Sequence, residues 1–232
     1  MKLTIERAAL LKSLAHVQSV VERRNAIPIL SNVLIDASDG GVALSATDMD
    51  IDIVDRADAE VSVAGATTAP VHTLYDIVRK LPEGAQIELS LDAESGQLNL
   101  KAGRSNFALQ SLPKEDFPSI GDGALPHEFS LSAENLRVLI DSTRFAVSTE
   151  ETRYYLNGIY CHAADHDGVK MLRAVATDGH RLARLEMPLP EGAEEIPGVI
   201  IPRKAVGELR RLLDDTNDDV RIALSETKIR FS

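Results

Sequence analysis

Apolar residues recur at two different spacings along the first half of the chain. A helix within residues 6 to 24 is predicted by apolar residues three or four positions apart, namely Leu10, Leu14, Val17 and Val21. From residue 29 to 64 apolar and polar residues alternate in short runs, which predicts an antiparallel meander of strands. A shorter helix at 73 to 81 precedes three further alternating runs, QIELSL, QLNLKA and SNFALQSL. These periods predict the α+β class with antiparallel sheets.

The same order of elements recurs in the second half. A strand followed by a helix at 133 to 147, with Ser132 placed to cap it, matches the first strand and helix, and a last helix is expected at 203 to 213. Thr47 and Thr177, which each precede an aspartate, are 130 residues apart, and Pro70 and Pro202 are 132 apart. Near-constant offsets predict two copies of one domain, and two unrelated domains with similar patterns are the alternative.

The two copies are expected at residues 1–125 and 126–232, and the stretch from 113 to 126, rich in Pro, Gly and Asp, is expected to connect them. The second copy stops at the equivalent of residues 98 to 102 of the first. The chain is therefore expected to be a fragment whose second domain is incomplete.

A hairpin is predicted within VATDGHRLARL, residues 175 to 185, because Asp178 and Gly179 stand between two alternating runs. An Asp-Gly pair in this setting favours a tight turn, with strands running up to Thr177 and away from His180. The Thr-Asp step recurs around Asp48, without the glycine.

Positive charge is concentrated in the predicted helices. They hold twelve basic and six acidic residues, although the whole chain of 232 residues has a net charge of -11. If the helices share one side of the sheets, that side could follow a phosphate backbone without reading base sequence. The alternative is that Lys and Arg are simply good helix formers on solvated faces.

The compartment is predicted from what the sequence lacks. It has one cysteine, Cys161, no uninterrupted apolar segment typical of a signal peptide, and no apolar run of membrane-spanning length. These features predict a cytoplasmic protein without a membrane partner.

Motifs for common enzyme chemistry are missing. There is no phosphate-cradling glycine loop and no G-x-S-x-G elbow. We expect no metal site, since the alternating aspartates read as one solvated strand face and the cysteine with its histidines gives too few zinc ligands; these residues are Asp48, Asp50, Asp52, Cys161, His162 and His166. A surface loop is expected near His166.

One cluster keeps an enzymatic alternative open. Asp178, His180 and Arg181 place a carboxylate, an imidazole and a guanidinium close together, which could support acid-base chemistry on a phosphate ester. The alternative function is therefore that of a phosphodiesterase-like enzyme.

Two of the four tyrosines, Tyr154 and Tyr155, are adjacent and follow Arg153. Paired aromatic rings beside an arginine can stack on bases or pack on the sugar-phosphate backbone. The alternative is a strand edge with one ring buried.

A set of motifs resembles a known family. RYYLNG at 153–158, ATDGHRLA at 176–183, IPRKAV at 201–206, TDMDI at 47–51 and LPKEDFP at 112–118 together resemble the β subunits of bacterial DNA polymerase III, the sliding clamps. The resemblance implies a non-catalytic ring of two chains, each with three clamp domains, whose helices surround duplex DNA and whose sheets lie outside. It implies no cofactor, and the third clamp domain is absent from this chain.

The resemblance also implies functional residues. DNA contacts would be made by Arg24, His72, Glu150, Tyr154, Tyr155, Arg203 and Lys204. His72 and Glu150 stand where the family pattern has a basic residue and an amide, and Glu150 would repel phosphate.

A pocket for short linear peptides of polymerase, clamp-loader and repair proteins would include Leu156, Thr177, Gly179, His180, Arg181 and Leu182. Phe107 and Leu109 match the interface of the homodimer and are expected to be exposed.

Overall fold

The computed structural model describes residues 1–38, 40–92, 94–118, 123–150 and 152–232. The chain divides into two compact units, Met1–Ile120 (unit 1) and Gly121–Ser232 (unit 2). Residues 119–122, within the expected connection, lie outside the described residues, as does Asp39. Across the described ranges no helix is long and apolar enough to cross a membrane.

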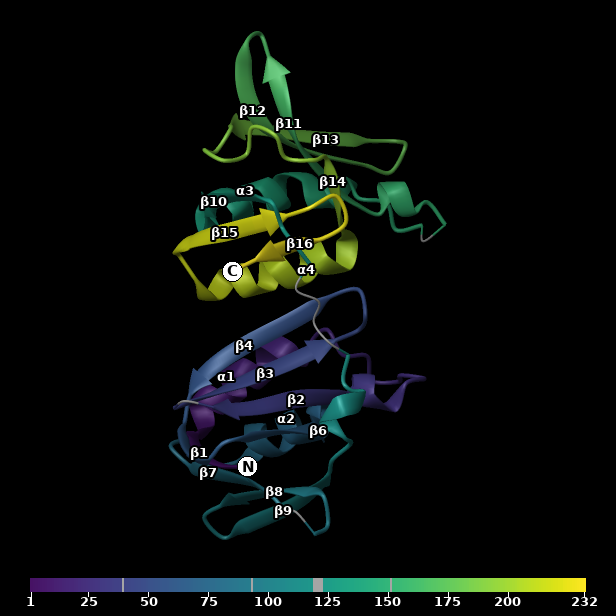
Figure 1. Ribbon diagram of the computed structural model, residues 1–232. Helices are drawn as coiled ribbons and strands as arrows, with labels where there is room; N and C mark the ends of the chain where they lie inside the picture. The colour runs from purple at the N-terminus through teal and green to yellow at the C-terminus, as the bar shows by residue number, and fades with distance from the viewer. Residues whose placement is uncertain (39, 93, 119–122, 151) are drawn as a thin grey trace. The chain divides into compact units, whose positions relative to one another are not determined.

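The described residues of unit 1 form two antiparallel sheets, two α-helices and short 3-10 helices (Figure 1). Its elements are β1 Lys2–Glu6, α1 Arg7–Val17, η1 Pro28–Ser31, β2 Asn32–Ser38, β3 Gly41–Thr47, β4 Asp52–Asp58, β5 Glu60–Val63, β6 Gly65–Pro70, α2 Val71–Lys80, β7 Gln86–Leu91, β8 Gln97–Ala102, β9 Ser105–Gln110 and η2 Lys114–Asp116. The strand orders are β5-β1-β7-β8-β9 and β4-β3-β2-β6.

Unit 2 repeats this arrangement with fewer strands (Figure 1). Its elements are β10 His127–Ser132, α3 Ala133–Thr143, η3 Arg144–Ala146, η4 Tyr154–Leu156, β11 Gly158–His166, β12 Val169–Thr177, β13 Leu182–Pro188, β14 Val199–Pro202, α4 Arg203–Leu212, η5 Leu213–Asp215, β15 Asp219–Leu224 and β16 Ile229–Phe231. The orders β10-β15-β16 and β13-β12-β11-β14 are again antiparallel. The predicted α+β class with antiparallel sheets is confirmed.

Each unit buries its own core. In unit 1 the predicted stripe of α1, Leu10, Leu14 and Val17, is fully buried with apolar residues of both sheets. In unit 2 α3 buries Leu136, Leu139 and Ile140 in the same way. The hydroxyl of Ser132 accepts a hydrogen bond from the Asn135 N–H at 3.2 Å, which confirms the predicted cap.

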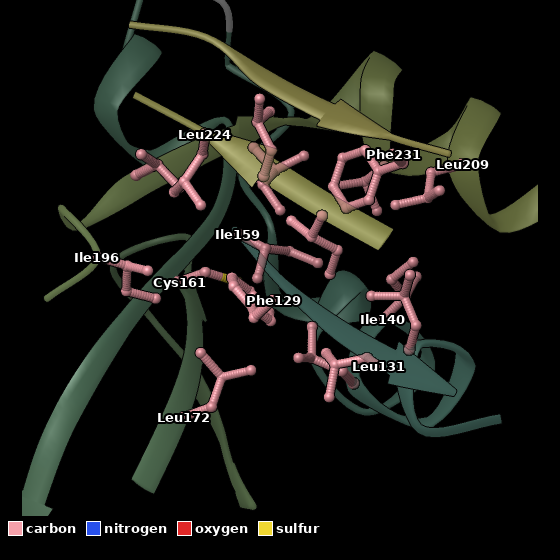
Figure 2. Close-up of a pocket in the computed structure, with 17 residues that line it drawn as sticks. Phe129, Leu131, Ile140, Ile159, Cys161, Leu172, Ile196, Leu209, Leu224 and Phe231 are labelled. Carbon is pink, nitrogen blue, oxygen red and sulfur yellow. The ribbon is translucent and has the colours of Figure 1, made fainter. Parts of the chain in front are cut away.

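The core of unit 2 contains a small cavity of about 30 Å³ (Figure 2). Its 17 lining residues are all apolar and include Phe129, Ile159, Cys161 and Phe231. A cavity of this size could hold a water molecule only if polar partners faced it, so it is a packing gap and not a binding site.

The first predicted helix is too long. α1 ends at Val17, where the prediction extended to residue 24. The Ser19 hydroxyl donates to the His16 carbonyl at 2.9 Å, and Val20 and Val21 turn into the core outside the helix. Val21 therefore keeps helical spacing without being helical, and Arg24 lies in an irregular segment.

The predicted helix at 133–147 is also shorter, since α3 ends at Thr143 and continues as the 3-10 helix η3. The Thr143 hydroxyl donates to the Leu139 carbonyl at 2.7 Å, a bond that competes with regular helix continuation.

The predicted single meander is wrong at β5. Strands β2, β3 and β4 pair in sequence, but β5 pairs with β1 in the other sheet, and β6 returns to pair with β2. Alternation predicts a strand and its two faces, and it does not determine which sheet the strand joins.

Candidate functional site

The hairpin between β12 and β13 ends in a four-residue loop. Thr177 and Leu182 form the last ladder pair, so the predicted tight turn with a strand restarting at His180 is wrong. Side chains replace the missing ladder bonds, since the Thr177 hydroxyl accepts from the Gly179 N–H at 3.1 Å and donates to the Arg181 carbonyl at 2.7 Å. Gly179 has φ +90°, a conformation that favours glycine.

Asp178 holds the loop from inside. Its carboxylate accepts the backbone N–H groups of His180 and Arg181, both at 3.0 Å, and the Arg181 Nε–H at 2.9 Å. These bonds, the one from His180 foremost, lower the pKa of Asp178 to about 2. The carboxylate is thus occupied and ionised at neutral pH, which makes it a poor general base and removes support from the phosphodiesterase alternative.

Two neighbours of this loop were missed by sequence reasoning. The Arg181 guanidinium carbon lies 5.8 Å from the centre of the Phe145 ring, and a Cβ atom on Gly179 would lie 3.5 Å from Arg153 Nη1. Phe145 is 56% exposed, which is unusual for phenylalanine. An arginine directly before the tyrosine pair was the available signal for Arg153, and no local pattern singled out Phe145.

The expected pocket residues lie at one end of the sheet formed by β13, β12, β11 and β14. Leu156 is half-buried at the end of η4, directly before β11, and the loop after β12 reaches the same end of the ladder. Leu182 is 64% exposed, while His180 and Arg181 are also exposed. The loop and η4 together present apolar and basic groups to solvent.

Tyr154 and Tyr155 lie in η4, not in a strand, and are 79% and 57% exposed. Their rings meet edge to face with centres 5.5 Å apart. The alternative of a strand edge with one buried ring is therefore wrong. The Arg203 N–H donates to the Asn157 carbonyl at 2.9 Å, which ties the start of α4, with Arg203 and Lys204 exposed, to the segment carrying the tyrosines.

Glu150 pairs with a protein cation. Its carboxylate lies 3.0 Å from Arg153 Nε, and both side chains are largely exposed. Its negative charge is therefore partly balanced within the chain.

In unit 1, the ring of His72 lies between two groups of the segment after α1. Its nitrogens contact Gln18 Oε1 at 3.2 Å and the Val21 carbonyl at 3.0 Å. His72 thus anchors the segment that carries Arg24, which is exposed.

The positive charge of the helices is reduced by ion pairs. Arg210 contacts Asp141 at 3.0 Å and Asp214 at 2.5 Å. Further pairs join Arg79 to Asp76 and Arg211 to Glu208 within one helix each, and Arg144 in η3 to Asp141 in α3. For Arg24 and Arg203, by contrast, the described part of the chain provides no ion pair. The count of basic residues therefore overstates the charge available to a polyanion.

The two expected interface residues on β9 differ. Phe107 is 38% exposed, but Leu109 is only 7% exposed and packs in the core of unit 1, so its expected exposure is wrong.

Among the described residues no group of three or more His, Cys, Asp or Glu side chains could hold a metal ion. Burial raises the pKa of the Cys161 thiol to about 12. Asp48 and Asp50 lie in the loop before β4 and not on one strand face with Asp52, and His166 ends β11.

Two family models match the chain. The N-terminal domain of the DNA polymerase III beta subunit matches residues 1–121, and its central domain matches residues 130–232. The chain belongs to the DNA polymerase III beta subunit family. The resemblance carried by the sequence motifs is confirmed.

Relatives within the DNA polymerase III beta subunit family are closely similar. A beta sliding clamp of Caulobacter vibrioides is 56% identical over 231 residues, which cover 100% of this chain and 62% of the relative. A solved structure described as Caulobacter crescentus pol III beta has a TM-score of 0.97 with 56% identity, over 100% of this chain and 63% of that one. The chain thus spans less than two thirds of the length of these relatives.

Solved structures of the family include complexes with a ligand. A sliding clamp from Bartonella birtlesii bound to griselimycin has a TM-score of 0.96 and 55% identity, over 100% of this chain and 62% of that one.

Proposed function

We propose that the full-length protein is a processivity clamp: a non-catalytic, cofactor-free homodimeric ring that encircles duplex DNA in the cytoplasm and tethers polymerase, clamp-loader and repair proteins. Residues 1–125 form clamp domain 1 and residues 126–232 most of clamp domain 2. The third clamp domain lies in the part of the protein beyond this chain, in keeping with the 62% of the Caulobacter relative that it spans.

The proposal that the protein binds DNA rests on one observation, namely the hydrogen bond that joins the segment of η4 to the start of α4. The segment that carries the two exposed tyrosines is joined to the start of α4, with Arg203 and Lys204, by the 2.9 Å hydrogen bond from the Arg203 N–H to the Asn157 carbonyl. Cations at a helix start and exposed aromatic rings suit a sugar-phosphate backbone without selecting bases. Such contacts are individually weak, as sliding requires. Arg24, in the segment that His72 anchors, adds a cation from unit 1. Glu150 would repel phosphate, and its ion pair with Arg153 reduces that repulsion.

The test is the salt dependence of duplex binding by the full-length protein with Arg24, Arg203 and Lys204 replaced by alanine. Each lost phosphate contact removes about 0.9 from the slope of log K against log salt, so the slope should fall by about 2 to 3. The control replaces Lys101, Arg104 and Lys114, which are exposed outside the α-helices and carry the same total charge. An unchanged slope in the first variant, or an equal loss in the control, contradicts the assignment.

The partner-binding part rests on the loop between β12 and β13. Gly179 permits close approach of a peptide backbone, Leu156 and Leu182 offer apolar contacts, and His180 and Arg181 offer polar ones. Griselimycin, which a Bartonella relative binds, serves as the probe, and we propose that it binds here.

Replacing Leu182 with serine should weaken griselimycin binding to the full-length protein about tenfold, since truncating an apolar anchor removes about 1.4 kcal/mol or more. Isothermal titration calorimetry measures the loss. The matched control is Val54→Ser, which removes an apolar side chain 44% exposed on β4. If the Leu182 variant bound griselimycin as tightly as the parent protein, the proposed location of the pocket would be wrong.

A further inference from the structure

The loop Asp178–Arg181 presents two of the pocket side chains, His180 and Arg181, yet no strand pairing holds it. The ladder ends at Thr177 and Leu182. Without ladder bonds, the conformation depends on the side chains of Thr177 and Asp178. Anything that removes their hydrogen bonds releases the groups that face the ligand.

Asp178 makes contacts of two kinds. One carboxylate oxygen, Oδ1, accepts the N–H groups of His180 and Arg181, and so fixes the backbone from which both side chains start. The other oxygen, Oδ2, accepts the Arg181 Nε–H at 2.9 Å and fixes the side chain itself. Asp178 is only 23% exposed, against 59% for Arg181, so it lies beneath the surface that Arg181 presents.

The second contact of the Arg181 guanidinium is the Phe145 ring, at 5.8 Å. A guanidinium whose Nε–H is bound by a carboxylate and whose carbon lies over an aromatic ring has few remaining rotamers. An exposed arginine without such partners would have to be ordered on binding, which weakens affinity.

We propose that Asp178 is a positioning residue of the peptide pocket, which prepares His180 and Arg181 for the ligand without touching it. The inference rests on the proposed pocket function. On this proposal Asp178 raises the affinity for the peptide, although its own carboxylate is bound within the loop.

Unit 1 contains a matched control. Asp48 Oδ1 accepts the N–H groups of Asp50 and Ile51 at 3.0 and 2.8 Å, in a loop of the same length between β3 and β4. If an aspartate at this place only stabilises the hairpin, then removing Asp48 and removing Asp178 have the same consequences. Asp178 in addition holds an arginine that lies over an aromatic ring.

The experiment measures griselimycin binding by calorimetry for Asp178→Ala, Asp178→Asn and Asp48→Ala, each in the full-length protein, together with thermal unfolding. Asp178→Ala removes all three bonds, and we expect affinity to fall about tenfold. Asp178→Asn keeps an oxygen for the two N–H groups but loses the charge, and we expect a loss of about threefold. Asp48→Ala should lower the unfolding temperature as Asp178→Ala does, with unchanged affinity.

Two results overturn the positioning role. One is affinity of Asp178→Ala equal to that of the parent protein while Leu182→Ser still weakens binding. The other is an equal loss in Asp48→Ala, which would make the effect one of general stability. If the parent protein does not bind griselimycin, or Leu182→Ser binds as tightly, the proposed pocket itself fails and this role with it.

Discussion

The loops Thr47–Asp52 and Thr177–Leu182 are built alike and present different chemistry. In each, the threonine hydroxyl accepts the N–H two residues later, and the aspartate carboxylate accepts the next two. In each, the third residue has positive φ, +82° at Met49 and +90° at Gly179. The Thr-Asp step thus sets the backbone conformation of both loops, whereas the side chains that the two loops present to solvent differ.

In each unit, an arginine of the first α-helix donates hydrogen bonds to backbone carbonyls at the end of the second. Arg7 in α1 donates to the carbonyls of Val78 and Arg79 at the end of α2, at 3.2 and 2.7 Å. Arg137 in α3 donates to those of Leu213 and Thr216 after α4, at 2.6 and 3.0 Å. A cation at a helix C-terminus satisfies unpaired carbonyls, and the two copies keep this contact from different positions of the first helix.

The largest expected effect is on the stability of unit 2, and it is caused by a substitution at Gly158, the first residue of β11. A Cβ atom on Gly158 would lie 2.4 Å from the Ile201 carbonyl oxygen, whereas unit 1 begins β2 with the buried side chain of Asn32. Gly158→Ala should destabilise unit 2 by about 3 kcal/mol and leave unit 1 intact. Hydrogen exchange followed by mass spectrometry reads the two units separately.

The control for that variant is Gly207→Ala in α4, where an added Cβ meets no atom within 4 Å. It should stabilise unit 2 by up to about 1 kcal/mol, because alanine is the better helix former. Equal destabilisation by both substitutions would contradict the steric argument.

An intermediate effect is expected from exchanging the third loop residues. Gly179→Ala places a side chain at φ +90° and should destabilise unit 2 by about 1 kcal/mol, while Met49→Gly should relieve a similar strain in unit 1. Urea unfolding followed by hydrogen exchange measures whether each substitution raises or lowers the free energy of unfolding of its unit. If both substitutions changed the free energy of unfolding in the same direction, the backbone conformations of the two loops would not be equivalent.

The smallest expected effect is on the stability of unit 1 at low pH. In unit 1, His16 Nδ1 lies 2.6 Å from Asp55 Oδ2, joining α1 to β4. Burial alone would raise the pKa of Asp55, but the hydrogen bond and charge of His16, with further bonds from Arg56 and Ser13, lower it below 3.8. The resulting stabilisation is present above pH 3.8 and is lost as the pH falls through the lowered pKa.

Replacing Asp55 with asparagine should therefore destabilise unit 1 at neutral pH, with a difference from the parent protein that shrinks below pH 4. Acid titration of unfolding, read by hydrogen exchange in α1, measures it. Asp58→Asn, an exposed position on the same strand, is the control. A constant difference from pH 7 to pH 2 would refute the linkage.

Much of the fold was predictable, and the errors have physical causes. Strands, helices and the Ser132 cap follow from local periods and short-range hydrogen bonds. Val21 misled the helix prediction because the core accepts an apolar side chain from an irregular segment as readily as from a helix. The tight turn at Gly179 was wrong because the side chains of Thr177 and Asp178 hold a wider loop.

The sequence by itself determined the repeat, the alternation of strand and helix, and the Thr-Asp frame of both loops, because each depends on residues that are near in the chain. Only the tertiary structure decided that Phe145 lies against Arg181, that Arg153 stands beside Gly179, and that β5 joins the sheet of β1. These contacts join segments tens of residues apart, and their formation depends on how sheets and helices pack, which no local spacing records.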